Sequence, residues 1–504
     1  MNQKKVYLKH TLYCVLFFYG GNALFATEFK MTDSCLKAQN CIYQFQFDEA
    51  DRILRNEKIL NQDNIAVHWL IDYSLFFKIF SSEDKNSYNS NLKLIKRNLA
   101  EVEAKKFNNA WHKTIVAEIY FHQGLIKLRF NDFYNAAFDI KKSFSLLKEN
   151  QKSFPAFLPD NKNYGTLLCL FSTIPSKYNF FANLIGIKGN MQLGLEQLEK
   201  YMNASVYYGE NIMLKKETAF YYAQIQHHIL KNTKKGLDLV LSNSKNHKNA
   251  LFENYMRSVF LHYSGKTDDV IQVISNFSGN NTYPFHYSNY LLGISKLRKL
   301  DKDAEINFIS YIKHFKGENL IKSSYRYLAR TAILKNDEQD ASKFYKLVLS
   351  KGKIDSDEDK IAEGEAKQAL SGGMYRSNIL RIRMLFDGKY YEQTETEIKK
   401  IDINQLPILK EWLEINYIQA KINEEQKKEE SAIAIYQKII LKGKDEPYYF
   451  AAYSALNLGY IYEVRKENIN ARKYYLMALN EFKNNKEYPN SIEIKANQGL
   501  KRLK

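Results

Sequence analysis

The stretch Ala455–Phe482, ALNLGYIYEVRKENINARKYYLMALNEF, decides the fold. It sets two small residues, Gly459 and Ala471, twelve positions apart, with Leu458 before the first and Tyr475 after the second. Two helices joined by a tight turn cross closely where small residues meet, and larger side chains fill the space around the crossing. The stretch therefore predicts a pair of antiparallel helices.

The same twelve-residue step between small residues recurs three times upstream. These copies are Ala420 to Ala432, Ala329 to Ala341 and Gly124 to Ala136. Weaker copies are Gly293 with Ala304, and Gly388 with Gln393 in place of the second small residue. A spacing that recurs in this way is typical of a chain built from stacked repeats.

The repeated positions resemble those of a tetratricopeptide repeat (TPR). The period here is about 40 to 50 residues, longer than the usual 34 of that family. The resemblance implies an all-α fold, an α-solenoid of stacked antiparallel helix hairpins forming a TPR-like superhelix. The middle third of the chain is less regular, and it is faintly similar to helical-repeat proteins of the inclusion-body-clearance type and to large exported TPR proteins of Bacteroidetes.

The composition agrees with a helical protein. The chain has 504 residues, 45% of them hydrophobic, but only 21 Gly and 7 Pro. That content excludes a disordered chain and most turn-dense β folds. The net charge is +18, but the lysines are scattered and no nucleic-acid-binding module accompanies them, so we expect no nucleic-acid partner.

The N-terminus resembles a secretory signal peptide. Lys4, Lys5 and Lys9 precede an apolar run at 12–26, and Ala26 suits a cleavage site. We therefore expect export to the periplasm or outer envelope of a Gram-negative bacterium. No later stretch is long and apolar enough to span a bilayer.

The chain divides into five expected regions. They are a signal peptide at 1–26, an N-terminal helical and TPR-like region at 27–160, an irregular helical-repeat region at 161–280, a TPR array at 281–488 and a capping helix at 489–504. In the last region Ile492, Ala496, Leu500 and Leu503 share one helical stripe, which suits a helix that ends a stack.

Three cysteines remain after cleavage, and two of them are candidates for a disulfide. Cys35 and Cys41 lie six residues apart, which is about 9 Å of rise on a continuous helix and beyond disulfide reach. A bond between them therefore requires Cys35 to precede the helix, and otherwise both stay free. Cys169 lies in an apolar run and is expected to be buried.

No pattern for catalysis, a metal or a cofactor is present. His227 and His228 are adjacent and have no ligand partners at metal-site spacing. The run Asp355–Asp359 begins like a calcium loop, but Lys360 stands where the turn glycine belongs. We expect an acidic loop that leads into a helix, with no metal and no enzyme activity.

The expected binding surface is the concave groove. In a TPR hairpin the residue three before the first-helix small residue, and the one directly after it, point away from the crossing and into the groove. Those positions are Tyr290, Arg326, Arg330, Asn378, Tyr417, Lys421 and Tyr460. Arginine forks and tyrosine rings suit an extended peptide or an anionic group, and the resemblance implies such a peptide-binding surface. The alternative is that these side chains only pair with nearby acids.

The sequence thus predicts an exported, non-enzymatic scaffold that binds a protein or peptide partner in its groove. Two alternatives stay open. One is an envelope enzyme or enzyme subunit whose site is assembled from distant residues. The other is a protein whose basic charge holds it at an anionic membrane surface.

Overall fold

The computed structural model describes residues 29–105, 109–173, 185–204, 212–230, 232–244, 251–277, 283–354, 356–485 and 487–503. These residues form 24 α-helices and no strand. The signal peptide predicted at 1–26 lies outside the described residues.

The helices of the first half are α2 (Asp33–Tyr43), α3 (Phe47–Leu60), α4 (Ile65–Ser82), α5 (Lys85–Ala104), α6 (Ala110–Arg129), α7 (Phe133–Ser153), α8 (Asn161–Phe171), α10 (Met191–Asn203), α11 (Ile212–His228), α12 (Thr233–Asn243), α13 (Leu251–Tyr263) and α14 (Thr267–Phe277). Those of the second half are α15 (His286–Arg298), α16 (Ala304–His314), α17 (Ile321–Leu334), α18 (Glu338–Ser350), α19 (Asp357–Gln368), α20 (Ser377–Asp387), α21 (Tyr391–Ile398), α22 (Leu409–Glu425), α23 (Glu429–Gly443), α24 (Phe450–Val464), α25 (Asn468–Asn480) and α26 (Pro489–Arg502). A π-helical turn, η2 (Ala369–Gly373), follows α19, and a short 3-10 helix, η3 (Ile403–Gln405), precedes α22.

Chain neighbours pack as helix pairs, and the pairs stack. The closest packing joins α6 with α7, α8 with α10, α15 with α16, α17 with α18, α22 with α23 and α24 with α25. The first helices of successive pairs also touch in series, from α13 through α15, α17, α20 and α22 to α24. The predicted all-α solenoid of stacked hairpins is confirmed.

One turn geometry recurs in eight helix hairpins of the described chain, those of α2–α3, α6–α7, α13–α14, α15–α16, α17–α18, α20–α21, α22–α23 and α24–α25. A residue with positive φ ends the first helix, and the N–H of the next residue bonds the carbonyl five positions earlier, as Asp337 N does to Ala332 O at 2.9 Å. The residues with positive φ are Phe45, Asn131, Gly265, Leu300, Asn336, Lys389, Lys427 and Lys466. This is the Schellman end of a helix, and its repetition gives the hairpins a common crossing geometry.

The predicted crossings of small residues are present. A Cβ placed on Gly124 would lie 2.7 Å from Ile140 Cγ1, and one on Gly459 would lie 2.5 Å from Tyr475 Cε1. Ala471 is fully buried in the same cluster as Tyr475. The glycines are therefore needed for the close approach of the paired helices.

Gly459 allows a direct stability test. The Tyr475 ring is held between Gly459 and Gly499, so a methyl group at Gly459 has no room. We expect Gly459→Ala to lower the free energy of unfolding by roughly 1–3 kcal/mol, measured by urea denaturation followed by circular dichroism. Gly364 provides the matched control, because a methyl group there would have nothing within 4 Å. Gly364→Ala should be neutral or stabilising by up to ~1 kcal/mol, and equal losses in both variants would contradict the crossing.

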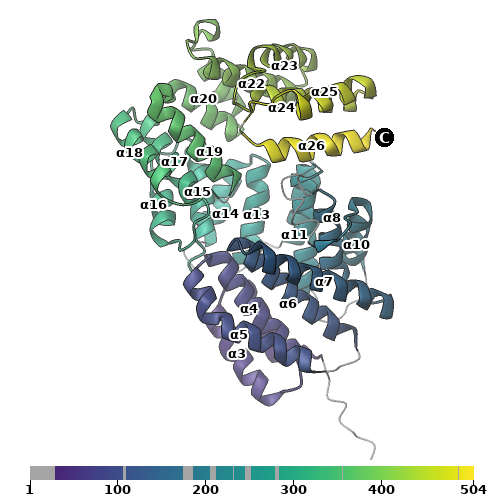
Figure 1. Cartoon of the computed structure of the whole chain (residues 1–504). Helices are drawn as coiled ribbons and strands as arrows, with labels where there is room; N and C mark the ends of the chain where they lie inside the picture. Colours follow the sequence, from purple (N-terminus) through teal and green to yellow (C-terminus); the bar gives the residue numbers. More distant parts are fainter. Residues whose placement is uncertain are drawn as a thin grey trace, which may run out of the picture.

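In Figure 1 the chain runs upward from the purple helices α3–α5, through the teal helices α11–α15, to the yellow helices α24–α26. The last helix then turns back toward the middle of the chain and lies between α24 and α11. Ile492 and Ala496 pack with α24 and α25, whereas Ile494 packs on a cluster that contains Tyr222 and Ile225 of α11. The C-terminal helix therefore bridges two parts of the solenoid in addition to ending the stack.

A buried charged network joins four helices of the first half. The Lys162 ammonium of α8 donates to the Tyr73 hydroxyl at 2.8 Å, to Glu217 at 2.7 Å and to the Glu118 carboxylate. These side chains come from α4, α6, α8 and α11. Burial alone lowers the pKa of Lys162, but the two carboxylates raise it above its ordinary value, so the ammonium stays charged.

Of the two alternatives for Cys35 and Cys41, the disulfide is not formed and both cysteines are free. Thr32 is the N-cap of α2, and its side chain accepts a hydrogen bond from Cys35 N, so both cysteines lie inside one helix. Their side chains are buried and free, as is Cys169. A continuous helix keeps the two sulfurs too far apart to bond.

Thiol labelling tests this correction. Burial raises the pKa of Cys35 and raises that of Cys169 to about 12, so few thiolates form near neutral pH. In protein that lacks residues 1–26, we expect slow alkylation in the native state and labelling of all three cysteines after unfolding without reductant, counted by intact mass. Labelling of Cys169 alone after unfolding would contradict the free pair.

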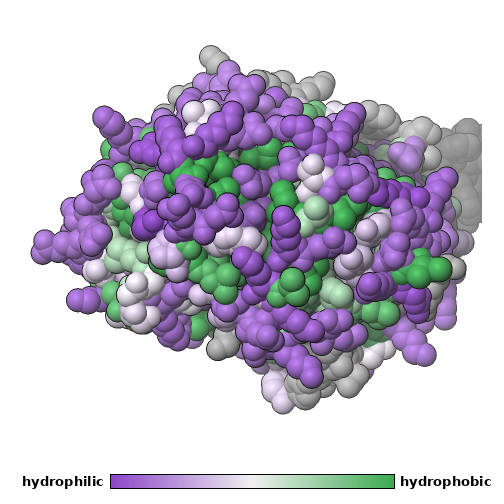
Figure 2. Space-filling model, turned by 90° about the horizontal axis from the view of Figure 1, so that it is seen from above, coloured by the Kyte–Doolittle hydropathy of each residue, from purple (hydrophilic) through white to green (hydrophobic). Residues whose placement is uncertain are grey.

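The face seen in Figure 2 is mostly hydrophilic, with separate apolar patches between the polar side chains. Among the described residues, none of the helices has the length and apolar character required to cross a membrane.

Candidate functional site

Two adjoining cavities in the second half form the candidate site, which we call the groove. The outer chamber, about 610 Å³, is lined by the exposed face of α19 and by Pro447 and Tyr448. The inner chamber, about 140 Å³, lies beside it and shares Ile361 and Glu487 with it. An open cleft that leads to a smaller polar chamber is a shape that ligands use.

Basic side chains from successive first helices converge on the inner chamber. They are Arg298 of α15, Arg326 and Arg330 of α17, Arg383 of α20 and Lys410 of α22. Stacking of the hairpins brings equivalent faces of these helices together, so residues more than a hundred positions apart line one small space.

The α19 helix carries two of the acidic side chains that line the inner chamber, Glu358 and Glu365. Ser356 is its N-cap, and Asp359 in its first turn accepts hydrogen bonds from Leu320 N at 2.8 Å and Ser323 N at 3.0 Å. Asp359 thus caps the start of α17 and fixes the two helices relative to each other. The expected acidic loop is therefore part of the helix itself, because Asp357, Glu358 and Asp359 form the first turn of α19, whereas Asp355 lies outside the described residues.

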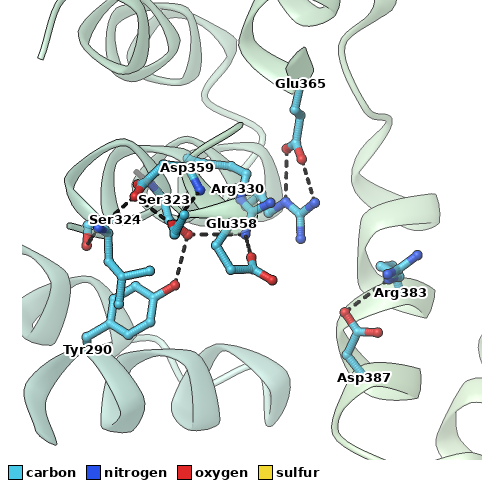
Figure 3. Close-up of polar contacts among 12 residues, drawn as sticks. Tyr290, Ser323, Ser324, Arg330, Glu358, Asp359, Glu365, Arg383 and Asp387 are labelled. Atoms are coloured by element: carbon cyan, nitrogen blue, oxygen red, sulfur yellow. Dashed lines mark hydrogen bonds and ion pairs between the residues drawn. The ribbon is translucent and has the colours of Figure 1, made fainter. Parts of the chain in front are cut away.

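Two arginines of α17 are paired with acids of α19, as Figure 3 shows for Arg330. Arg330 donates to both oxygens of Glu365, at 2.9 and 2.6 Å, and Arg326 Nη2 donates to Glu358 at 2.8 Å. Burial alone raises the pKa of Glu365, but Arg330 lowers it to about 2. These ion pairs form one wall of the inner chamber.

Arg383 and two tyrosines form the opposite wall. Arg383 donates to Asp387 and Glu414, both at 3.0 Å, and to the Tyr449 hydroxyl at 2.7 Å. The Tyr375 ring lies between two cations, 5.7 Å from Arg330 and 4.8 Å from Lys410. The aromatic faces stabilise these charges where water is excluded.

Several donors of the chamber have no carboxylate partner among the described residues. Arg326 is only 3% exposed, and its Nε has no hydrogen-bond partner. Lys410 Nζ bonds only the amide oxygen of Gln368, at 2.8 Å. Arg298 bonds only the ring of His262, whose pKa burial and the neighbouring arginine lower well below its ordinary value. Five cations and four carboxylates line the inner chamber, and Arg383 also contacts Glu414, so Lys410 and Arg298 lack a direct ion pair without a large excess of positive charge.

The segment before α26 contributes to the boundary between the chambers. Glu487 accepts a hydrogen bond from Tyr449 N at 3.1 Å, at the start of α24, and burial raises its pKa. Tyr488 follows with a φ of 53°, in the left-handed region, and its ring packs edge-on against Tyr449. A carboxylate is thus already held at the place where the two chambers meet.

The structure brings only Arg326 and Arg330, of the seven predicted groove residues, to the lining of the groove. Tyr290 and Tyr417 are buried behind it, and their hydroxyls bond Ser323 and Asn457. The remaining three lie elsewhere on the array: Asn378 is exposed at the start of α20, Lys421 pairs with Glu424, and Tyr460 faces Arg502 of α26.

The sequence-based choice missed Arg383, Lys410, Tyr449 and Glu487. A signal for Lys410 does exist, because it lies seven residues before Tyr417 and a seven-residue step returns to nearly the same face of a helix. No local signal places Glu487 there, since it enters the groove from the segment that leads to α26.

The histidine pair His227–His228 does not line the groove. Among the described residues, no group of three or more His, Cys, Asp or Glu side chains could hold a metal ion. His227 stacks on Tyr263 at 3.9 Å and bonds the Thr233 hydroxyl at 2.9 Å. Burial lowers the pKa of His227 to about 3, so the ring is neutral and structural.

Comparison with known proteins adds little to this picture. No protein-family model and no curated protein matches the chain. The crystal structure of the APC/C hetero-tetramer Cut9-Hcn1 is similar, at 15% identity over 98% of this chain and 94% of that chain, with a TM-score of 0.22. Values this low transfer neither a partner nor an activity, and the α-solenoid stands on this chain's own helix pairs and turns.

Proposed function

We propose that the chain is an exported scaffold that binds a protein or peptide partner in the groove without catalysing a reaction. The observation that carries this is the convergence of five cations from four first helices on a chamber that opens into a wider cleft. An extended chain fits the outer chamber, and an acidic or polar group fits the inner one. Arginine forks hold such groups with defined geometry.

The absence of catalysis is supported by the state of the acids in the chamber. Glu358, Glu365 and Asp387 each contact an arginine guanidinium. Of the three, Glu365 has its pKa lowered to about 2 by Arg330, and a carboxylate that stays ionised suits a binding surface better than a general acid. The alternative of an envelope enzyme has no comparable observation in its favour.

The test is partner capture from an envelope extract with groove variants. Arg326 and Arg330 are unsuitable for charge reversal because both are buried in ion pairs, and a glutamate there would disrupt the fold. Lys410→Met removes one groove charge and keeps the length of the side chain. Lys421→Met, on the same helix but outside the groove lining, is the matched control.

We expect Lys410→Met to weaken capture of the partner by about tenfold and Lys421→Met to leave it unchanged. Equal retention of every bound protein by both variants would overturn the groove assignment. The thermal midpoint of both proteins, measured alongside, shows that a loss does not come from unfolding.

A further inference from the structure

A buried carboxyl group lies where α6, α7 and α8 meet. Asp160 stands at the start of α8 and is 0% exposed. Its side chain makes no capping hydrogen bond to the first turn of its own helix. The two carboxyl oxygens instead contact Thr114 of α6 and Asn150 of α7, which are also buried. The carboxyl group therefore joins three helices of the first half at one point.

The Asp160 carboxyl has no ion-pair partner among the described residues. Glu149 of α7 is 61% exposed, and it pairs at the surface with Lys113 of α6, at 2.6 Å. Helix α10 reaches the junction with an uncharged group, since Gln197 lies 3.5 Å from Gln151 of α7. An ionised carboxylate at this place is buried without a countercharge, which costs much free energy.

The lysine closest in sequence is engaged by other acids. The Lys162 ammonium of α8 contacts the carboxylates of Glu118 on α6 and Glu217 on α11. Burial raises the pKa of Asp160 to about 7 against the effect of its two hydrogen bonds, and the negative charge of Glu118 adds to the rise. The charges on the surrounding helices therefore do not favour a second anion here.

The hydrogen bonds around the carboxyl group are satisfied best when the carboxyl itself carries a proton. The Thr114 hydroxyl has one hydrogen, yet its oxygen lies 2.8 Å from Ala110 O and 2.6 Å from Asp160 Oδ1. The Asn150 amide has two hydrogens and three acceptors, Ala110 O at 2.9 Å, the Thr114 oxygen at 3.1 Å and Asp160 Oδ2 at 2.9 Å. A proton on Asp160 Oδ1 can be donated to the Thr114 oxygen, which leaves the Thr114 hydrogen for Ala110 O.

We propose that Asp160 is an un-ionised carboxylic acid in the folded chain, and that it makes the junction of α6, α7 and α8 sensitive to pH. When the junction opens, the carboxyl reaches water and ionises with the ordinary pKa of an aspartate, about 3.9. Between about pH 4 and 7 the closed junction therefore holds a proton that the open one has lost, and its stability decreases as the pH rises. This junction is separate from the groove and does not depend on the proposed function.

Asp160→Asn tests the protonation state, because the amide has the shape of the neutral acid and can likewise donate to Thr114 and accept from Asn150. The chain without residues 1–26 is unfolded by urea at several pH values. From about pH 5 to 7 we expect the unfolding constant of the wild type to rise by at least about tenfold relative to that of the variant. A ratio that stays constant over this range would show that Asp160 is ionised throughout, and would overturn the proposal.

Asp238→Asn is the matched control. Asp238 is 58% exposed on α12, so its carboxyl group meets water in the folded and in the unfolded chain. The ratio of the unfolding constants of the wild type and this variant should be the same at each pH. An equal pH dependence for Asp160→Asn and Asp238→Asn would also overturn the proposal.

Hydrogen exchange of the unsubstituted chain gives a local reading that does not require any variant to fold. The Tyr164 amide at the start of α8 donates to the Asp160 carbonyl at 3.0 Å, so it reports the opening of this junction. Corrected for the intrinsic exchange rate, its protection should fall by at least about tenfold from about pH 5 to 7, and that of amides within α24 should change less. Constant protection of the Tyr164 amide, or an equal loss in α24, would contradict the proposal.

Discussion

Lys162→Met is expected to lower the free energy of unfolding by about 3–5 kcal/mol at pH 7. The Lys162 side chain is 1% exposed, and its ammonium lies between Glu118 and Glu217, which are 2% and 3% exposed. Removing the ammonium leaves the carboxylates of Glu118 and Glu217 buried without its opposite charge. Urea denaturation of the chain without residues 1–26, followed by circular dichroism, measures the loss.

The sign of its pH dependence separates this loss from a packing defect. Burial raises the pKa of Glu118, but Lys162 and His122 lower it overall, so wild type loses this stability as the pH falls below about 4.3 toward the folded value. In Lys162→Met the carboxylates repel each other and take up protons on folding. The difference between the two proteins should therefore shrink as the pH falls from 7 to about 5.

The controls for Lys162 come from the same part of the chain. The exposed pair Lys234–Asp238 joins side chains that are 87% and 58% exposed, so Lys234→Met should change stability by less than about 1 kcal/mol. A triple variant, Lys162→Met with Glu118→Gln and Glu217→Gln, should regain most of the loss. A triple variant as unstable as the single one would contradict the electrostatic account.

Arg330→Met is expected to have the second large effect, again about 3–5 kcal/mol. It removes the bidentate partner of Glu365, which then keeps only the Tyr345 hydroxyl, at 2.9 Å. Because Arg330 holds the pKa of Glu365 near 2, the pair stabilises the fold above about pH 4.3 and loses this contribution as the pH falls toward 2. In Arg330→Met the free energy of unfolding should not show this decrease between about pH 4.3 and 2.

A double-mutant cycle completes the Arg330 experiment. Arg330→Met with Glu365→Leu removes both charges and fills the space with apolar groups, so most of the stability should return. The interaction energy from the cycle should be at least about 2 kcal/mol. Additive losses would mean that the two side chains act independently.

Much of the fold could be predicted because the crossing residues are local and periodic. Gly459, Ala471 and Tyr475 lie within one hairpin, and their packing follows from their spacing. The turns were harder to see, since glycine occupies the positive-φ position only at Gly265, and lysine, asparagine, leucine or phenylalanine occupies it in the other hairpins. Because glycine is absent from seven of these eight turns, no clear sequence signal marks the ends of those first helices.

The residues that line the groove could be predicted only in part, because they depend on how far the solenoid rotates between one helix pair and the next. The rule that selected Arg326 also selected Tyr460, but α26 covers that part of the concave face and places Arg502 over the Tyr460 ring. Glu487 enters the groove from the segment before α26. Such long-range returns of the chain have no local sequence signal.

The most direct test of the central claim, that a partner binds in the groove, is site-specific photo-crosslinking in the source cells. A benzophenone amino acid replaces Tyr448, which lines the outer chamber, or Leu441, which is exposed on α23. The account predicts a crosslinked partner from position 448 that is lost when Lys410→Met is added, and none from position 441. A partner crosslinked from position 441 and not from 448, or a product at 448 that Lys410→Met leaves unchanged, would contradict it.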